Sequence, residues 1–442
     1  MRNNVGSRLE SLVEMKRLTP ARAESALAAP YKETPQPEPA PDLHRVPLDI
    51  VGQGAVAFEV KRLTGVDRYD ILLKEQERGD WLVLVTIEDA RITAKSKDGS
   101  VAEVKVAPGL LIGFTASSMF LWVSVDRAND RITVGHGYLM DKNRLLTLHL
   151  PPAIPRAMGK VEGRHEEIHG LAWRVRFVEI ANQVEVASAK LVRMPITIDT
   201  PPKLVEHNAF TLLELAGNQA TVASALPLEA QVLYGVVAGD NVVLDDSDAA
   251  AINYSISTEG MTLWKKLTEK RKKAEFGDGN MVYIRVTIGP NQGDSTGVPF
   301  VLEIWPSQCY SPVHNHGGTV AVIKVLHGSI TVDWYNPLAK EGNNEDLQSL
   351  GQATFEAGQV TWITPEMYQT HKLTNRRLDT MCATIQCYRY LDRDSDHYEF
   401  FDYVPADPKA ELGHFRPDSD FEYLELLTMV RWELEHHRPY PG

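Results

Sequence analysis

Two histidines in the C-terminal third of the chain, His314 and His316, stand two residues apart in the segment SPVHNHGGTVAVIKV. On a β-strand, residues i and i+2 point to the same face, so both imidazoles would face one space. A third histidine, His371, comes after a second β-rich run and Pro365, and Asn375 follows it by four residues. Strands that lie side by side would bring the three rings together. This pattern predicts a metal site formed by His314, His316 and His371.

The residue types leave the identity of the metal open, because imidazole is a suitable ligand for Fe, Zn, Ni and Cu. The five residues after His316 are GGTVA and include no carboxylate. Three neutral ligands leave coordination positions free and bring no negative charge to the site. An anionic substrate such as a thiolate would supply that charge.

The segment FVLEIWPSQCYSPVHNHGG resembles the thiol dioxygenase family of the cupin superfamily, of which cysteine dioxygenase is a member. The resemblance covers roughly residues 205–405. It implies a cupin fold, a mononuclear non-haem Fe(II) held by the three histidines, and O2 and a small thiol as substrates. The product would be the sulfinate of that thiol.

The resemblance also implies roles for four further residues. Arg285, in MVYIRV, would anchor a substrate carboxylate, which a guanidinium can bind through two parallel hydrogen bonds. Tyr388 would be the catalytic tyrosine, whose hydroxyl can bond to dioxygen or to the substrate. Trp305, nine residues before the first histidine, and Gln386 would line the substrate site. The residue types alone also fit structural roles, namely a salt-bridged arginine, a core tyrosine and a tryptophan in the wall.

The sequence departs from the family pattern at two places. Animal-type cysteine dioxygenases carry a cysteine seven residues after the first histidine that is cross-linked to the tyrosine, and this chain has Ala321 there. No such cross-link is expected. The family's Ser-His-Tyr relay corresponds here to Thr384, Gln386 and Tyr388, and glutamine cannot titrate near neutral pH as histidine does. Which thiol is the substrate therefore stays open.

Length and composition limit the classes of function. A chain of 442 residues should form two or three domains. Its net charge of −13, from 46 basic and 59 acidic residues, argues against nucleic acid or an anionic membrane as the main partner. Three cysteines, Cys309, Cys382 and Cys387, make no disulfide framework and favour a reduced, cytoplasmic setting. We find no signal peptide and no apolar run of about 18 residues that could span a membrane.

The pattern of the chain predicts a mainly β protein with three parts. Residues 1–46 read as a helical, proline-rich tail and linker. Residues 47–200 carry short β-rich runs separated by turns such as Asp98-Gly99, which is typical of an antiparallel β-sandwich. Residues 201–442 are expected to form the cupin, a small β-barrel or jelly roll with a few flanking helices. The clearest helix is MTLWKKLTEKRKKAEFG, with Gly277 at its end.

The N-terminal half resembles the β-sandwich modules named after farnesoic acid O-methyltransferase, in FLWVSV and ITVGHG. No glycine-rich nucleotide loop accompanies this likeness, so methyl transfer is not expected. His136, between Gly135 and Gly137, is either an exposed turn residue or faces a ligand. The sandwich is interpreted as a binding or dimerisation module, through which the chain would form a homodimer.

Three functions follow from the sequence. The first is the thiol dioxygenase. The second is another three-histidine metal cupin enzyme, catalysing ring cleavage, isomerisation or a lyase reaction. The third is a binding or scaffold protein with a vestigial cupin, which would contain no stoichiometric iron when purified.

Overall fold

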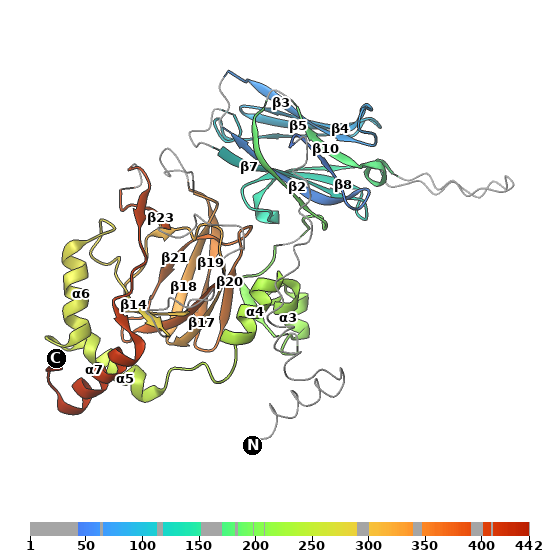
Figure 1. Ribbon diagram of the computed structural model, residues 1–442. Coiled ribbons are helices and arrows are strands. Elements are labelled where there is room, and N and C mark those ends of the chain that lie inside the picture. The colour runs from blue at the N-terminus through green and yellow to red at the C-terminus, as the bar shows by residue number, and fades with distance from the viewer. Residues whose placement is uncertain are drawn as a thin grey trace, which may run out of the picture. The chain divides into compact units, whose positions relative to one another are not determined.

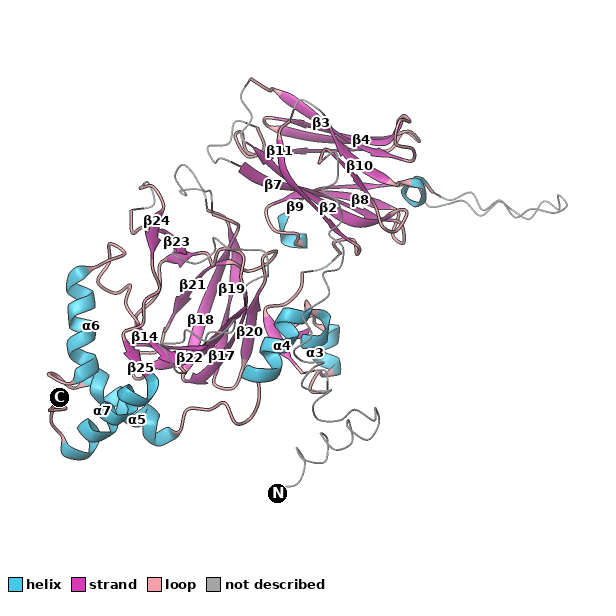
Figure 2. Cartoon of the chain, viewed as in Figure 1, coloured by secondary structure: helices cyan, strands magenta, loops and turns pink. Residues whose placement is uncertain are grey.

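The computed structural model describes residues 43–61, 65–112, 118–151, 170–181, 184–197, 199–206, 208–289, 300–338, 347–389, 401–407 and 410–441. Strands predominate in these residues, and the α-helices described all belong to the C-terminal region (Figures 1 and 2). The predicted helical tail lies outside the described residues except for its last few positions. Among the described helices, none has the length and apolarity that a membrane span requires.

The N-terminal region consists of two antiparallel sheets. Its elements are β1 (Arg45–Pro47), β2 (Gln53–Lys61), β3 (Arg68–Lys74), β4 (Trp81–Glu88), β5 (Arg91–Ser96), β6 (Val101–Lys105), β7 (Ser118–Asp126), β8 (Arg131–His136), η1 (Asp141–Asn143), β9 (Arg144–His149), η2 (Leu171–Arg174), β10 (Phe177–Ile180) and β11 (Val186–Val192). The strand orders are β1-β10-β3-β4-β5-β6 and β11-β2-β7-β8-β9. This is the predicted sandwich.

Alternating side chains explain why these segments pair as strands with one buried face. In β3, Tyr69, Ile71 and Leu73 are buried while the residues between them are half-buried or exposed. Every second side chain of a strand points to the same face, so these three join the apolar core between the sheets. The turn between β5 and β6 contains Gly99 at φ +93°, a conformation that glycine adopts without steric cost. Asp98-Gly99 is therefore the turn that the sequence predicted.

The C-terminal region has two further sheets. Its elements are β12 (Lys203–Val205), α3 (Leu212–Ala216), β13 (Thr221–Val222), η3 (Ala223–Ala225), α4 (Leu228–Val237), α5 (Asp246–Ser257), α6 (Thr262–Lys273), β14 (Ile284–Ile288), β15 (Phe300–Trp305), β16 (Val313–His314), β17 (Val320–His327), β18 (Ser329–Tyr335), β19 (Ser349–Glu356), β20 (Val360–Ile363), β21 (Thr370–Thr374), β22 (Cys382–Arg389), β23 (Phe401–Val404), β24 (Gly413–Phe415), β25 (Phe421–Glu422) and α7 (Tyr423–His436). The orders are β13-β12-β20-β17-β22-β15-β14-β25 and β19-β18-β21-β16-β23-β24.

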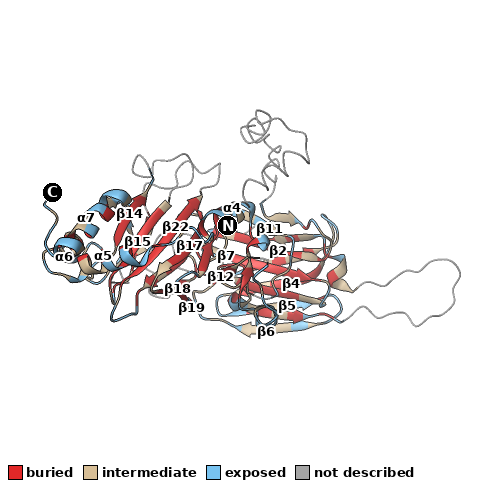
Figure 3. Cartoon of the chain, turned by 90° about the horizontal axis from the view of Figure 1, so that it is seen from below, coloured by how far each residue is buried: buried red, intermediate tan, exposed pale blue. Residues whose placement is uncertain are grey.

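These two sheets share no strand within the described residues, so the region is two-layered and not a closed barrel. Buried residues concentrate on the strands of both regions, as the red segments of Figure 3 show. The predicted fold class is confirmed: the protein is mainly β, with a sandwich followed by a second β region and flanking helices. The domain boundaries drawn from the sequence stay predictions.

Helices α5, α6 and α7 pack against the outer face of β14, β15 and β22. The side chain of Glu433, fully buried in α7, ties the three helices together. It accepts hydrogen bonds from Ser255 Oγ of α5 at 2.6 Å and from the Thr262 backbone N–H of α6 at 2.8 Å. Helix α6 is the predicted one, but it ends at Lys273. Ala274 takes the left-handed conformation there, so Gly277 lies beyond the helix end.

The segment around η1 reaches from the sandwich into the core of the C-terminal region. Tyr138 and Met140 are buried members of that core. The side chains of Asn143 and Asn336 exchange two amide hydrogen bonds, of 2.9 and 3.1 Å. The Tyr138 hydroxyl lies 3.4 Å from Oγ1 of Thr370 on β21. The sandwich therefore supports the strand that carries a predicted metal ligand.

Candidate metal centre

The three predicted ligands come together between the two C-terminal sheets. His314 on β16 is directly paired with His371 on β21, so neighbouring strands present these rings side by side. His316 lies two residues beyond the end of β16 and outside any strand, so the prediction that one strand carries both histidines is wrong for His316, although its ring still joins the cluster. All three side chains are buried. Among the described residues they form the one group of histidines, cysteines and carboxylates arranged to hold a metal ion.

The distances within this cluster fit one metal ion. The three candidate ligand nitrogens lie within 4.8 Å of one another, and Nε2 of His316 is 3.1 Å from Nε2 of His371. Two nitrogens bound at right angles to a metal about 2.1 Å away would themselves be about 3 Å apart. The rings are close but not stacked face to face, with centroids 4.8 to 4.9 Å apart.

Backbone carbonyls set the tautomers of two of the rings. Nδ1 of His314 donates to the Pro312 carbonyl at 3.0 Å, and Nδ1 of His371 donates to the Tyr368 carbonyl at 3.1 Å. Because a carbonyl only accepts, the Nε2 lone pairs of both rings remain for a metal, an arrangement common to metal-ligating histidines. Nδ1 of His316 is buried without a hydrogen-bond partner. A metal at this cluster would give a partner to Nε2 of His316 and Nε2 of His371, which otherwise face each other.

Burial keeps the three rings neutral, the state in which imidazole binds metal. Desolvation lowers the pKa of His314 to about 3 and that of His371 to about 4. The pKa of His316 is held well below its ordinary value by burial and by the two neighbouring rings. The residues therefore fit a divalent transition metal at neutral pH, and three imidazoles do not decide among Fe, Zn, Ni and Cu.

The backbone before His371 is held in an uncommon conformation. Tyr368 has φ +65°, which is rare for a residue with a side chain. Its ring is buried against Trp334 and Trp362, and its hydroxyl donates to the Thr200 carbonyl. These contacts fix Tyr368 so that its carbonyl meets Nδ1 of His371. Strain of this kind, maintained by surrounding packing, is typical of functional sites.

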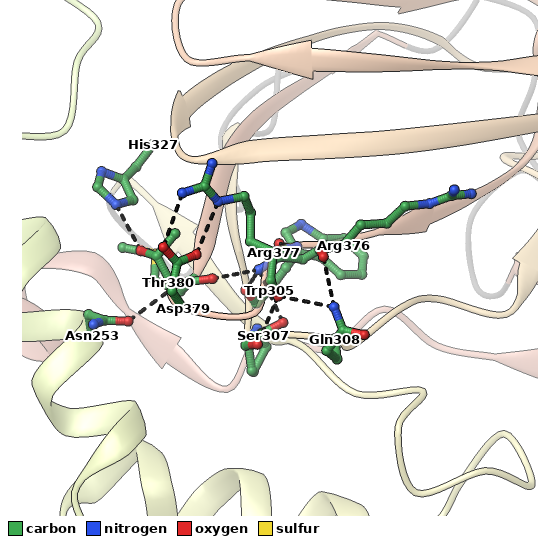
Figure 4. Close-up of polar contacts among 12 residues, drawn as sticks. Asn253, Trp305, Ser307, Gln308, His327, Arg376, Arg377, Asp379 and Thr380 are labelled. Atoms are coloured by element: carbon green, nitrogen blue, oxygen red, sulfur yellow. Dashed lines mark hydrogen bonds and ion pairs between the residues drawn. The ribbon is translucent and has the colours of Figure 1, made fainter.

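Asn375, the residue that follows His371 in the sequence pattern, has a structural role. Its fully buried amide donates to the carbonyls of Trp305, Pro306 and Thr380. Figure 4 shows the surrounding bonds, in which Ser307 and Gln308 reach the backbone of the opposite loop. This network joins the turn after β15 to the turn between β21 and β22, and so fixes the strands on both sides of the site.

The predicted residues Arg285, Gln386 and Tyr388 lie on the facing eight-stranded sheet and form one buried network with Glu303. Nη1 of Arg285 donates to Oε1 of Glu303 at 2.7 Å. Nε2 of Gln386 donates to the other oxygen of Glu303, and the Tyr388 hydroxyl donates to Oε1 of Gln386. The Tyr388 ring stacks beside His316, with centroids 5.6 Å apart. A chain of polar contacts therefore leads from Arg285 to the edge of the histidine cluster.

Glu303 was not predicted as a site residue. It stands in the strand FVLEIW, where a charge among apolar residues was the available signal. Burial raises the pKa of Glu303, and Arg285 counteracts part of that effect. Burial alone would lower the pKa of Arg285, but Tyr388 and Glu303 raise it above the ordinary value. The arginine predicted to anchor a substrate carboxylate thus already has a carboxylate partner.

The pairing of β17 with β22 shows where the family's cross-link would lie. Ala321 on β17 is paired with Tyr388 on β22, so a cysteine there would lie beside the tyrosine. Cys387 adjoins Tyr388 in the chain, but successive residues of a strand point to opposite faces. All three cysteines are free and buried. That no cysteine cross-links to Tyr388 stays a prediction.

Trp305 lies behind the polar network, and His136 lies in the sandwich. Trp305 is buried, stacks on Tyr283 with centroids 4.5 Å apart, and donates from Nε1 to Thr384 Oγ1 at 3.3 Å. It therefore forms part of the wall behind the network, and its predicted contact with substrate stays a prediction. His136 ends β8 and is half-buried, and burial lowers its pKa.

No protein-family model matches the sequence. Solved structures resemble part of the chain at low identity. An oxalate oxidase in complex with the substrate analogue glycolate is 14% identical, with a TM-score of 0.20, over 24% of this chain and 50% of that chain. A cupin-superfamily sugar phosphate isomerase from Silicibacter pomeroyi is 14% identical, with a TM-score of 0.19, over 28% of this chain and 71% of that one.

A cupin domain of a transcriptional regulator from Enterobacter cloacae is 13% identical, with a TM-score of 0.19, and covers 25% of this chain and 97% of that domain. The chain spans about half the length of the oxalate oxidase that it matches. Two of these three proteins are described as cupins, and two are described as enzymes. Similarity of this extent identifies neither the metal nor the substrate, which must be argued from the site itself.

Proposed function

We propose that the chain binds one Fe(II) through His314, His316 and His371 and uses O2 to oxidise a small thiol to its sulfinate. The main support is the cluster itself, three buried neutral imidazoles without a carboxylate, beside a tyrosine and a buried arginine. The reaction is R–S⁻ + O2 → R–SO2⁻, in which the O–O bond breaks and two S–O bonds form. When bound, the iron would supply adjacent positions for sulfur and dioxygen and favour the thiolate.

Charge favours an anionic ligand at this site. A divalent metal held by three neutral rings keeps its charge of +2, and the Arg285–Glu303 pair adds no net charge. A thiolate bound at the metal would therefore compensate part of a buried positive charge. This argument applies to thiols in general and does not choose among them.

The Arg285–Glu303 pair suits a thiol that carries both an amine and a carboxylate. A guanidinium has five N–H donors, and Nη1 is the atom engaged by Glu303 in the contact described above. Further donors of Arg285 can bind a substrate carboxylate, while Glu303 can accept from an ammonium group. An amino-acid-like thiol would complement both groups at once.

Tyr388 would act from beside His316. Its hydroxyl donates to Gln386, so it has to leave that amide before it can donate to dioxygen or to the substrate. Gln386 therefore holds the tyrosine in place of the family's histidine, without a titrating group. Replacement of Gln386 by leucine should change the rate of thiol oxidation more than the affinity for metal.

One observation favours a second candidate, another three-histidine cupin enzyme that transfers protons. Glu303 is a buried carboxyl whose pKa is raised, a property shared by many general acids and bases. An isomerase or lyase could use such a group beside a metal ion. Such an enzyme would consume no O2, which separates the two candidates.

The test is oxygen uptake by iron-loaded protein with cysteine, cysteamine, 3-mercaptopropionate or homocysteine, together with mass spectrometry of the product. We expect uptake with at least one thiol and a product heavier by two oxygen atoms. His371→Ala should lose both iron and uptake, whereas His149→Ala, at an exposed position of the sandwich, should keep both. Stoichiometric iron without uptake for any thiol would refute the proposal in favour of the second candidate. Protein that binds no metal would instead support the scaffold function.

A further inference from the structure

A cavity opens at the surface between α6, the start of β14 and the segment 415–420. Its volume is about 170 Å³, roughly ten times the space that one water molecule needs on the same measure. Aromatic side chains line its inner part, and charged side chains of α6 line its rim.

Two side chains connect the cavity to the histidine cluster. Phe415 lines the cavity, and its ring meets the ring of His314 edge-on, with centroids 6.0 Å apart. Arg285 also lines the cavity, and its guanidinium bonds to Glu303 in the buried network. One aromatic ring therefore stands between the cavity and a predicted metal ligand.

The ring of Phe415 belongs to a small aromatic cluster that covers the histidines. It contacts Phe276 at 5.3 Å and Phe401 at 5.6 Å between centroids, and Phe401 itself lies 4.8 Å from His316. Phe415 is the last residue of β24, a three-residue edge strand that pairs only with β23 within the described residues. Short edge segments open at low free-energy cost compared with central strands. Phe415 is thus on a less supported strand than Phe401, because β23 pairs with both β16 and β24.

The charged side chains that line the cavity balance one another. Five are basic and four are acidic, but one of the five, Arg285, is already paired with the buried Glu303. Lys266 and Lys270 lie 3.3 and 2.6 Å from the two oxygens of Asp420, which also accepts from the Arg285 backbone N–H. Recognition of a carboxylate in the cavity therefore depends on Arg285 and not on a surplus of charge at the rim.

We propose that this cavity is the entrance to the histidine site for small molecules and that Phe415 is its gate. A carboxylate-bearing thiol would pass the charged side chains of α6, meet Arg285 at the inner end, and reach the histidines when the Phe415 ring swings aside. The thiol as occupant rests on the proposed function. The route itself does not, because any small molecule should follow it.

The test measures access without turnover. The protein is loaded with Co(II), whose visible absorption reports metal bound by imidazole, and the metal is removed with dipicolinate, a small dianionic chelator. The observable is the part of the removal rate that rises with chelator concentration. We expect Phe415→Leu to raise this rate about tenfold and Phe415→Trp to lower it. Phe355→Leu, the same change at a buried core position away from the cavity, should alter the rate less than twofold.

A second experiment blocks the rim chemically. Lys273 lines the cavity and is exposed, while its neighbour Lys272 is exposed and does not line it. Because the native cysteines are buried, Lys273→Cys and Lys272→Cys each offer one accessible thiol for a bulky maleimide. We expect the label at 273 to slow metal removal several-fold and the label at 272 to leave it unchanged.

The outcomes separate the entrance from the proposed function. Removal rates that change neither with the Phe415 substitutions nor with the label at 273 would refute the proposed entrance, regardless of any thiol oxidation. Rates that respond as expected, in a protein that takes up no O2 with any thiol, would establish the entrance and refute the thiol dioxygenase.

Discussion

The buried pair of Arg285 and Glu303 allows a quantitative test of how the site is held together. Their charged atoms are 2.7 Å apart, and the side chains are only 10% and 5% exposed. Removing one partner of such a pair leaves an uncompensated buried charge and costs about 3–5 kcal/mol. We therefore expect Glu303→Leu to lower the free energy of unfolding by that amount.

The double variant Arg285→Leu/Glu303→Leu should be more stable than the single one. Replacing both charges by apolar side chains is often close to neutral, because the desolvation of two ions disappears with their attraction. The Gln386 amide still loses its acceptor, which costs about 1–3 kcal/mol. The double variant should thus regain about 2 kcal/mol relative to Glu303→Leu.

The assay is urea unfolding of the metal-free protein, followed by tryptophan fluorescence, with the slope checked for constancy across variants. A double-mutant cycle with Arg285→Leu gives the coupling free energy. If the two single changes simply add, the pair is not coupled and the reasoning about the network fails. The same variants keep all three histidines, so they should bind metal while losing thiol oxidation.

Four further predictions follow from the structure. Because burial raises the pKa of the cysteine thiols, native protein at pH 8 should react with Ellman's reagent far more slowly than unfolded protein. The unfolded protein should show three thiols, and a fast reaction of the native protein would contradict their burial. Gly137→Ala should lower the free energy of unfolding by more than about 1 kcal/mol, since φ is +71° and a Cβ would lie 2.4 Å from Asn336 Oδ1. A urea midpoint equal to that of the wild type would show that Asn336 can move away without cost. Acidification from pH 6.5 to pH 4 should destabilise the metal-free protein by about 3 kcal/mol from His371 alone, because its pKa falls from 6.5 to about 4 on folding and stability is complete only above 6.5. His371→Gln should lose about 3 kcal/mol less than the wild type over this range, while His314 and His316 still contribute their share; an equal loss in both proteins would contradict the prediction. Ala321→Cys, loaded with iron and supplied with O2 and thiol, should form a thioether to Tyr388 and lose two hydrogen atoms of mass, and Tyr388→Phe in that background should prevent it.

Much of the fold could be predicted because the strands carry their signals locally. Alternation of apolar and polar residues in segments such as 68–74 specifies a strand and its buried face. The spacing of His314 and His316, with a third histidine further along, was enough to predict a shared metal site. Each of these signals lies within a few residues, or depends on one strand pairing with the next.

The contacts that the sequence left open depend on which strands become neighbours. Glu303 faces Arg285 only because β14 and β15 pair in that register, and an isolated glutamate in an apolar strand has no visible partner. Phe415 covers His314 from a position about 100 residues away in the chain. The end of α6 at Ala274 was missed because alanine favours the helix interior and rarely adopts the left-handed conformation that it has there.

Two side-chain hydrogen bonds join Asn143 to Asn336, and Tyr138 and Met140 belong to the core of the C-terminal region. These contacts limit how the chain can be divided into fragments. A cut near the predicted boundary at residue 200 would remove two side chains from the interior of the C-terminal region. It would also leave a buried amide of Asn336 without its partner. A C-terminal fragment would therefore expose an apolar surface and tend to aggregate. Separating the two β regions would therefore cost the C-terminal region part of its own interior.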